Sequence, residues 1–155
     1  EDRIKNEKFD QKLNYLSEMK DFFRKNSPKK SILVGDLNIA PLPEDVWSTR
    51  QLRNTVSHTA IERENLLALV EQGGWTDSVR AHFGPKEVLF SWWSYRARDW
   101  VASNRGRRLD HIWVSRDLAS KVEAVTIESA MRGAEKPSDH VPLTITLQPE
   151  CCYLD

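Results

Sequence analysis

The sequence is poor in cysteine and lacks long hydrophobic segments, and both absences limit the class of protein. Its only two cysteines, Cys151 and Cys152, are adjacent, so they cannot join distant parts of a fold and do not match metal-site spacing. No apolar run approaches the roughly 20 residues that span a bilayer, and the N-terminus lacks the apolar block of a secretory signal. We therefore expect a soluble protein of the reducing cytoplasm, not exported and without a membrane partner.

Net charge is absent as well, but the charges are unevenly distributed. The 23 basic and 23 acidic side chains cancel, so no overall positive field indicates nucleic acid as a partner. Between Ser91 and Arg116, however, there are six arginines and only two aspartates, together with four of the six tryptophans. A prediction of nucleic-acid binding must therefore depend on this local segment.

The length of 155 residues fits a single domain with its own core. The opening residues, Glu1 to Lys8, are highly charged, include no initiator Met and lead directly into a helical pattern, which indicates a fragment of a longer protein. We expect one folded unit over residues 1–147. Residues 148–155 are expected to be a tail, for which the sequence indicates no role.

Two amphipathic helices and several short strands are predicted. Apolar residues recur at helical spacing over residues 9–23, and a second helix begins after Thr59, where Glu62 completes a capping box. Strand patterns occur at residues 31–34, 88–93, 109–114, 122–127 and 141–147, and a polar loop covers residues 94–107. Because helices and strands do not alternate regularly, the pattern predicts an α+β or layered α/β fold.

Asp36 and Asn38 form the first candidate site. They follow the predicted strand 31–34, and side chains two positions apart on an extended segment point to the same side. A carboxylate is suited to moving a proton or binding a hard cation, and an amide to holding a phosphate oxygen. The alternative interpretation is a simple turn, since Gly35, Asp36 and Asn38 are all residue types that favour turns.

Two further segments place aspartate beside histidine. Asp139 and His140 precede strand 141–147, where neither helps a core, and histidine suits phosphate contact or proton transfer near neutral pH. Asp110 interrupts an apolar strand, and a buried carboxylate is costly without a partner. We expect His140 to be that partner and His111 to be a bystander. The alternatives are a surface turn at residues 138–140 and a solvent-facing Asp110.

The fourth candidate is the aromatic and basic stretch from Phe90 to Arg107. It reads Phe-Ser-Trp-Trp-Ser-Tyr-Arg, followed after a gap by Asn-Arg-Gly-Arg. Arginines beside exposed aromatic rings suit pairing with phosphates, stacking on bases and wedging into a distorted helix. The alternative is that the aromatic side chains belong to a strand and its core, with solvated arginines after them.

In order and approximate spacing, the four segments resemble the C-terminal half of the exodeoxyribonuclease III family, within the endonuclease/exonuclease/phosphatase superfamily. The resemblance covers about residues 7–147, and its most specific parts are Trp-Trp-x-Tyr-Arg and Asn-Arg-Gly-Arg-Arg-Leu-Asp. It implies half of a four-layered α/β sandwich, with a mixed, largely antiparallel sheet and flanking helices. It also implies a DNA-repair enzyme that cleaves 5′ of abasic sites and has 3′-to-5′ exonuclease activity.

The resemblance implies roles for individual residues. Asp36 would activate the attacking water or protonate the leaving oxygen, and Asn38 would orient the phosphate. Asp110 would support His140, which would stabilise charge on the phosphate or act as the base. Asp139 and Asp36 would contribute to a site for Mg²⁺, or alternatively Mn²⁺. Trp92 matches the position that packs against an extrahelical abasic sugar, and the DNA-facing residues would be Trp92, Trp93, Arg96, Asn104 and Arg105.

The implied partner is double-stranded DNA with abasic sites or 3′ ends, bound by a monomer in a bacterial cytoplasm. The chain departs from the family because it lacks the N-terminal half, which supplies the Asn and Glu of the principal Mg²⁺ site and a catalytic Tyr. We therefore expect the chain alone to bind metal weakly and to cleave little. Two alternatives stay open: a non-catalytic DNA-binding fragment or degenerate relative, and a superfamily phosphatase acting on a small or lipid phosphoester.

Overall fold

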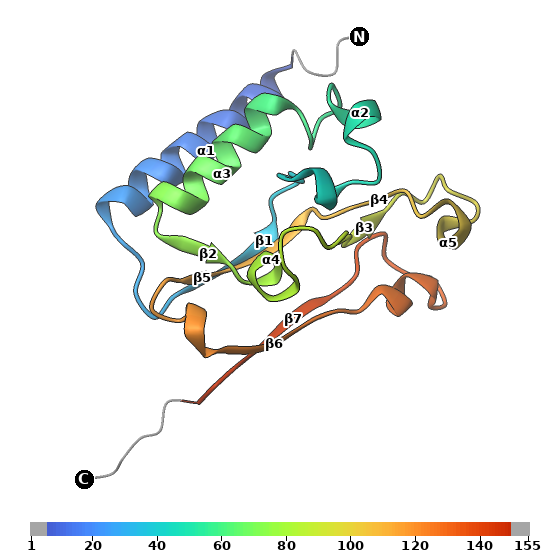
Figure 1. The fold of residues 1–155 in the computed structure, drawn as a ribbon. Helices are drawn as coiled ribbons and strands as arrows, with labels where there is room; N and C mark the ends of the chain where they lie inside the picture. Colours follow the sequence, from blue (N-terminus) through green and yellow to red (C-terminus); the bar gives the residue numbers. More distant parts are fainter. Residues whose placement is uncertain (1–5, 150–155) are drawn as a thin grey trace.

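The fold consists of three small antiparallel sheets and a pair of long helices (Figure 1). The structure, a computed structural model, describes residues 6–149. Its main sheet has the strand order β1-β5-β2, beside the two-stranded sheets β3-β4 and β6-β7. The strands are β1 (Ile32–Asp36), β2 (Trp75–Asp77), β3 (Trp92–Trp93), β4 (Gly106–Arg107), β5 (Asp110–Ser115), β6 (Val122–Ile127) and β7 (Leu143–Leu147). The helices are α1 (Glu7–Lys25), α2 (Thr49–Leu52), α3 (Ala60–Gln72), α4 (Ser78–Phe83), α5 (Trp100–Ser103) and the short 3₁₀ helices η1 (Pro43–Asp45), η2 (Ala119–Lys121) and η3 (Ser129–Gly133).

Local sequence signals set the start of both long helices. The Asn6 side chain accepts a hydrogen bond from the Phe9 amide at 2.9 Å and caps α1. Acidic residues occupy the first turn of α1 and basic residues its last, as the helix dipole favours. The predicted capping box at α3 is present, with Thr59 and Glu62 bonding each other's backbone amides. Both predicted helices are therefore confirmed.

The long helices cover one face of the main sheet, and the β6-β7 ribbon covers the other. α1 and α3 lie side by side (Figure 1), and their Leu16 and Leu66 pack against Trp75 and Trp113 of the sheet. Ile112 of β5 meets a second cluster that includes residues of β6 and β7. Every strand pair is antiparallel. The predicted class, a layered α/β fold with a largely antiparallel sheet, is confirmed.

Several predicted strand bounds are wrong. Of the strand expected at residues 88–93, only β3 forms, because Leu89 is buried but its amide donates, at 3.0 Å, to the carbonyl of Glu44 in the 3₁₀ helix η1 and not to a strand. β2 and α4 were not predicted; the Asp77 side chain ends the strand by capping the helix. The loop expected at residues 94–107 contains α5 and β4. Strand 122–127 is confirmed, and those expected at residues 31–34 and 109–114 are shifted towards the C-terminus. The strand expected at residues 141–147 ends as predicted but begins two residues later, at Leu143.

A buried ionic network lies beneath the strand ends. Arg108 is fully buried and donates to both carboxylate oxygens of Asp45, at 2.7 and 3.0 Å, and to Asp77 at 2.8 Å. Its Nη1 also lies 3.3 Å from His111 Nδ1. Because arginine has no acceptor, Nδ1 must accept, so His111 Nε2–H donates to the Ile39 carbonyl at 2.8 Å. Arg108 therefore adds nothing to the basic surface, and His111, expected to be a bystander to the chemistry, is a buried core residue whose ring bonds Arg108 and the Ile39 carbonyl.

No helix within residues 6–149 is long and apolar enough to cross a membrane. The first five residues of the charged opening and the Cys151-Cys152 pair lie outside the described residues. Of the expected tail, Gln148 and Pro149 are described and have no regular secondary structure.

Acid should destabilise the fold through His111. Burial, and after it the charge of Arg108, lowers the pKa of His111 to about 4, from an ordinary value of 6.5. The unfolded chain therefore binds this proton first, so the contribution is complete above about pH 6.5 and is lost as the pH falls towards about 4. Between about pH 7.5 and about pH 5, His111 should lower the free energy of unfolding by about 2 kcal/mol, measured by urea denaturation.

His111→Gln is the matched variant because its amide cannot titrate. The variant should be less stable than the wild type at neutral pH but should lose less stability over the same acid range. A second measurement is the NMR signal of the His111 ring, which should stay in its neutral position down to about pH 5. A ring that titrates near pH 6.5 would contradict the buried hydrogen bonds of His111.

Gly106→Ala should destabilise the fold more than Gly133→Ala. A Cβ at Gly106 would lie 2.6 Å from Phe90 Cβ and overlap the Phe90 ring, whereas a Cβ at Gly133 would lie 3.8 Å from the Trp100 ring. Neither glycine has a left-handed backbone, so crowding is the main difference. Overpacking a core costs about 1–3 kcal/mol, and thermal unfolding of both variants measures it. Equal stability of the two variants would show that Phe90 moves aside freely.

Candidate active site

β1 and β5 bring two carboxylates to the same end of the main sheet. The strands pair antiparallel with Asp36, the last residue of β1, opposite Asp110, the first residue of β5. The Asp36 side chain is 41% exposed and that of Asp110 is 23% exposed. Both groups are therefore held by a strand ladder while remaining open to solvent, as reactive side chains must be.

His140 joins the two carboxylates. It lies between η3 and β7 and forms an isolated β-bridge with Trp92. Its Nδ1 is 2.8 Å from Asp110 Oδ2, a hydrogen bond, and its Nε2 is 3.8 Å from Asp36 Oδ2, too long for one. The contact predicted between Asp110 and His140 is therefore present. Because an ionised carboxylate only accepts, Nδ1 carries a proton and Nε2 is the nitrogen left free for a ligand.

The surrounding charges favour the cationic form of His140. Partial burial acts to lower the pKa of His140, but the hydrogen bond to Asp110 and the charges of Asp110, Asp36 and Asp139 outweigh it. The pKa of His140 is therefore raised above its usual 6.5. A cationic imidazole flanked by carboxylates is suited to contacting an anionic oxygen.

Ser91 positions Asp110, and sequence reasoning gave it no role. The buried Ser91 hydroxyl donates to Asp110 Oδ2 at 2.6 Å and accepts from the amides of Leu109 and Asp110, at 3.0 and 3.1 Å. Its carbonyl accepts from the Val141 amide at 2.8 Å, beside His140. One residue thus links the start of β5 to the segment that carries His140. The only signal in the sequence was a serine within an aromatic run.

Asn38 lies in a turn next to Asp36. Its amide donates to Asp36 Oδ1 at 2.7 Å, and its φ of 51° is in the left-handed region that asparagine tolerates. Lys12 of α1 bridges the Asn38 carbonyl, at 2.7 Å, and the buried Glu62 carboxylate, at 2.6 Å. The turn interpretation of this segment is therefore correct. It still leaves Asn38 exposed beside Asp36 and the candidate site.

Asp139 adjoins the same centre through Trp92. Its Oδ2 accepts a hydrogen bond from Trp92 Nε1 at 2.9 Å. Trp93 points elsewhere: it is 4% exposed, and its Nε1 donates to Asn104 Oδ1 at 3.1 Å. Its ring packs at right angles to Phe90, 6.0 Å between centroids. The prediction that Trp93 faces DNA is therefore corrected, since it is a core side chain that Asn104 helps to fix.

A basic cavity lies beside these residues. Arg96 and Arg105, both predicted to contact DNA, are exposed and line it together with Trp92. Trp47 and Arg107 also line it, although sequence reasoning assigned neither a role. Arg107 lay within the recognised Asn-Arg-Gly-Arg segment, whereas Trp47 lay in a stretch without any motif.

The described residues do not form a complete metal site. Within residues 6–149, no three Asp, Glu, His or Cys side chains are grouped so that they could hold an ion. Asp36 and Asp139 each have one oxygen engaged, by the Asn38 amide and by Trp92. A magnesium ion needs about six oxygen ligands, so the predicted pair of aspartates supplies only part of the set.

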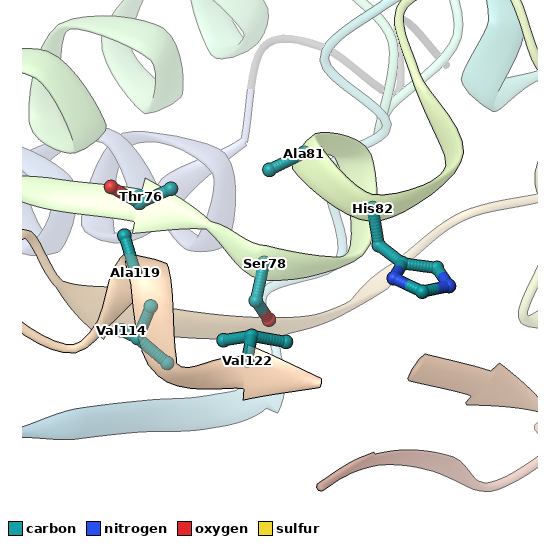
Figure 2. Close-up of a pocket in the computed structure, with 7 residues that line it drawn as sticks. All are labelled: Thr76, Ser78, Ala81, His82, Val114, Ala119 and Val122. Atoms are coloured by element: carbon teal, nitrogen blue, oxygen red, sulfur yellow. The ribbon is translucent and has the colours of Figure 1, made fainter. Parts of the chain in front are cut away.

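A separate cavity of about 300 Å³ is lined by residues of β2, α4, β5, η2 and β6. Figure 2 shows Ser78 and Val122 facing each other across it. Its only titratable lining residue is His82, and the Ser78 hydroxyl donates to the Ile112 carbonyl at 2.6 Å. Since no carboxylate reaches it, this cavity does not combine the groups that phosphate chemistry needs.

Comparison with known proteins identifies several relatives of this chain. The chain is 31% identical to exodeoxyribonuclease III of Haemophilus influenzae over 150 residues, which are 92% of this chain and 56% of the relative. It is 34% identical to an exodeoxyribonuclease of Bacillus subtilis over 137 residues, 87% of this chain and 49% of the relative. A solved structure of an AP endonuclease from Archaeoglobus fulgidus superimposes with a TM-score of 0.84 at 30% identity.

The Archaeoglobus match covers 94% of this chain and 57% of the solved one. A 3′ phosphatase from Neisseria, solved with a product DNA hairpin, matches with the same TM-score at 28% identity. The chain thus spans about half the length of the relatives it matches. A model of the Endonuclease/Exonuclease/phosphatase family matches residues 15–140, and the chain belongs to that family.

Proposed function

We propose that this chain carries part of the reaction centre of a DNA-repair phosphodiester hydrolase. The enzyme cleaves 5′ of abasic sites and has 3′-to-5′ exonuclease activity. The observation that carries the proposal is the line Asp110–His140–Asp36, in which one imidazole is bonded to a carboxylate and faces a second. The names of the relatives, an exodeoxyribonuclease and an AP endonuclease, support the same reaction.

His140 is the proposed contact to the phosphate. Asp110 holds its Nδ1, so that Nε2–H is left to donate to a non-bridging oxygen where negative charge develops in the transition state. The raised pKa of His140 favours the cationic form that does this best. Ser91 holds Asp110 in turn, so the imidazole is oriented before substrate binds.

Asp36 is the proposed group that handles the proton. It is exposed, it lies 3.8 Å from His140 Nε2, and one of its oxygens is free of the Asn38 amide. A carboxylate there is suited to activating the attacking water or protonating the leaving 3′-oxygen. The Asn38 side-chain amide, next along the turn, is the proposed donor that orients the phosphate.

The proposed cofactor is a divalent cation, Mg²⁺ or Mn²⁺, with Asp36 and Asp139 as two of its ligands. Such an ion supplies charge stabilisation on phosphoryl oxygens. The proposed substrate is double-stranded DNA with an abasic site or a 3′ end, reached from the side of Arg96 and Arg105. The cytoplasmic location and monomeric state stay predictions.

A second candidate function is DNA binding without cleavage. It is favoured by the incomplete metal-ligand set among residues 6–149, combined with a cavity that three arginines line. The two functions differ in turnover: a binding module holds an abasic duplex in a salt-dependent way and leaves both strands intact.

Asp36→Asn and His140→Ala should each abolish most DNA cleavage. The assay is nicking of a duplex with an abasic analogue, by the 155-residue chain and by a chimaera in which it replaces the matching part of the Haemophilus exodeoxyribonuclease III. The chain alone should be weakly active. The chimaera should nick with Mg²⁺ and not with chelator, and each variant should lower its rate by at least about a hundredfold.

Matched controls are Asp21→Asn, on the exposed side of α1, and His82→Ala, in the distant cavity. Both should leave nicking unchanged. Full activity in Asp36→Asn or His140→Ala would rule out the proposed roles. Salt-sensitive binding of the duplex by an inactive chimaera would favour the second function.

The 155-residue chain should bind divalent cations weakly, because only two proposed ligands lie within the described residues. The expected dissociation constant for Mg²⁺ or Mn²⁺ is on the order of millimolar or weaker, measured by calorimetry or by Mn²⁺ electron paramagnetic resonance. Asp139→Asn should remove most of that binding, and Asp21→Asn should not change it. Micromolar affinity would show that the ligand set is more complete than the structure indicates.

A further inference from the structure

The basic cavity beside the candidate site is large enough for part of a nucleotide. Its volume is about 600 Å³, and it opens between the segment that follows η1, the loop before α3, and the β3-β4 pair. Three arginines and no acidic residue line it. The side chains that matter to its chemistry are Trp47, Trp92, Arg96, Arg105 and Arg107.

Two of these arginines are held in place by tryptophan rings. The Arg105 guanidinium lies 4.6 Å from the centre of the Trp47 ring, and that of Arg107 lies 5.2 Å from the centre of the Trp92 ring. Cation–π contacts at these distances orient a guanidinium without neutralising its charge. The rings thus serve here as supports for cations rather than as open platforms for stacking.

Arg107 has unsatisfied capacity for an anion. Its Nη1 donates to Ser57 Oγ at 2.8 Å and to the Val56 carbonyl at 3.4 Å, and its Nε is buried without a hydrogen-bond partner, so Nη2 is the nitrogen that remains for a ligand. Within the described part of the chain it forms no ion pair with a carboxylate. Burial lowers the pKa of Arg107, although the charge of Glu62 acts against this, and Glu62 is already bonded to Lys12. A partly buried cation without a counter-ion is costly, and an anionic ligand would remove that cost.

Trp92 connects this cavity to the candidate reaction centre. Arg107 lies over its ring, and its Nε1 donates to Asp139 at 2.9 Å, next to His140. A group bound at Arg107 is therefore separated from the Asp139–His140 segment by a single indole ring.

We propose that this cavity is a phosphate-binding subsite and that Arg107 is its specificity-determining residue. It takes the phosphate of a nucleotide that neighbours the bond to be cleaved, through the planar fork of N–H donors that suits phosphate oxygens. The resemblance implied that Trp92 packs against an abasic sugar, whereas a guanidinium lies over the Trp92 ring. The identity of the ligand as a DNA strand rests on the proposed nuclease function; the affinity for phosphate does not.

The test is a titration of the 155-residue chain with thymidine 3′-monophosphate in the presence of chelator. Tryptophan fluorescence measures the binding. Without a cation, the three aspartates of the reaction centre repel an anion, so binding reports on the cavity. The wild type should bind the monophosphate and should not bind thymidine measurably. Arg107→Leu should weaken binding by about tenfold or more, as expected for a lost charge-assisted hydrogen bond.

Arg98→Leu is the matched control, because Arg98 is exposed in the same loop and does not line the cavity. It should bind as the wild type does. Arg107→Lys keeps the charge but loses the fork, so its affinity should lie between those of the wild type and Arg107→Leu even if the leucine variant folds poorly. Equal losses in the Arg98 and Arg107 variants, or no loss in either, would overturn the proposal.

A third ligand, the dinucleotide TpT, distinguishes the two sources of phosphate. Tighter binding of the monophosphate indicates a terminal phosphate, and equal binding indicates a backbone diester; both support a phosphate subsite. Phosphate binding by a chimaera that does not cleave DNA would sink the proposed function and leave this inference standing. Cleavage of DNA without Arg107-dependent phosphate binding would overturn this inference and leave the proposed function standing.

Discussion

The buried Arg108 guanidinium is the interaction on which the rest of the site depends. It binds Asp45, the last residue of η1, and Asp77, which lies at the junction of β2 and α4. Through His111 it also reaches the Ile39 carbonyl, directly after Asn38. Since Asp110 lies two residues after Arg108 in the sequence, one cation fixes both strand ends that carry the carboxylates of the candidate site. Removing one partner of such a buried pair typically costs about 3–5 kcal/mol, because the other charge stays buried.

The parts of the fold with local causes could be predicted from the sequence. The start of α3 is set by Thr59 and Glu62, three residues apart, and the ends of β6 coincide with the predicted strand. β2 and α4 were missed because their stability comes from distant partners, such as the pairing of Trp75 with Ser115. Leu89 has the apolar character of a strand residue, but its backbone partner is Glu44 in the 3₁₀ helix η1. The spacing of apolar residues predicts which side chains are buried, but it does not predict which segment they pack against.

The candidate site also has features that could be predicted from the sequence and features that could not. The contact of Asp110 with His140 could be anticipated because a carboxylate in an apolar strand needs a partner, and the two residues are 30 positions apart in sequence. The core position of Trp93 could not be separated from the half-exposed position of Trp92, because adjacent tryptophans look alike until the strand faces are known. The proposed roles of Ser91 and Arg107 were missed because they depend on contacts that only the folded chain creates: the hydrogen bonds of Ser91 to the start of β5, and the position of Arg107 over the Trp92 ring.

The pairing of Asp36 with Asp110 has a kinetic consequence. The two residues are far apart in sequence, and contacts of this kind form slowly because the chain between them must first be closed into a loop. α1 and α3, with their local caps, can form much earlier than that pairing. A chain that has its helices but has not yet paired β1 with β5 therefore lacks the candidate site, because Asp36 and Asp110 do not yet lie opposite each other.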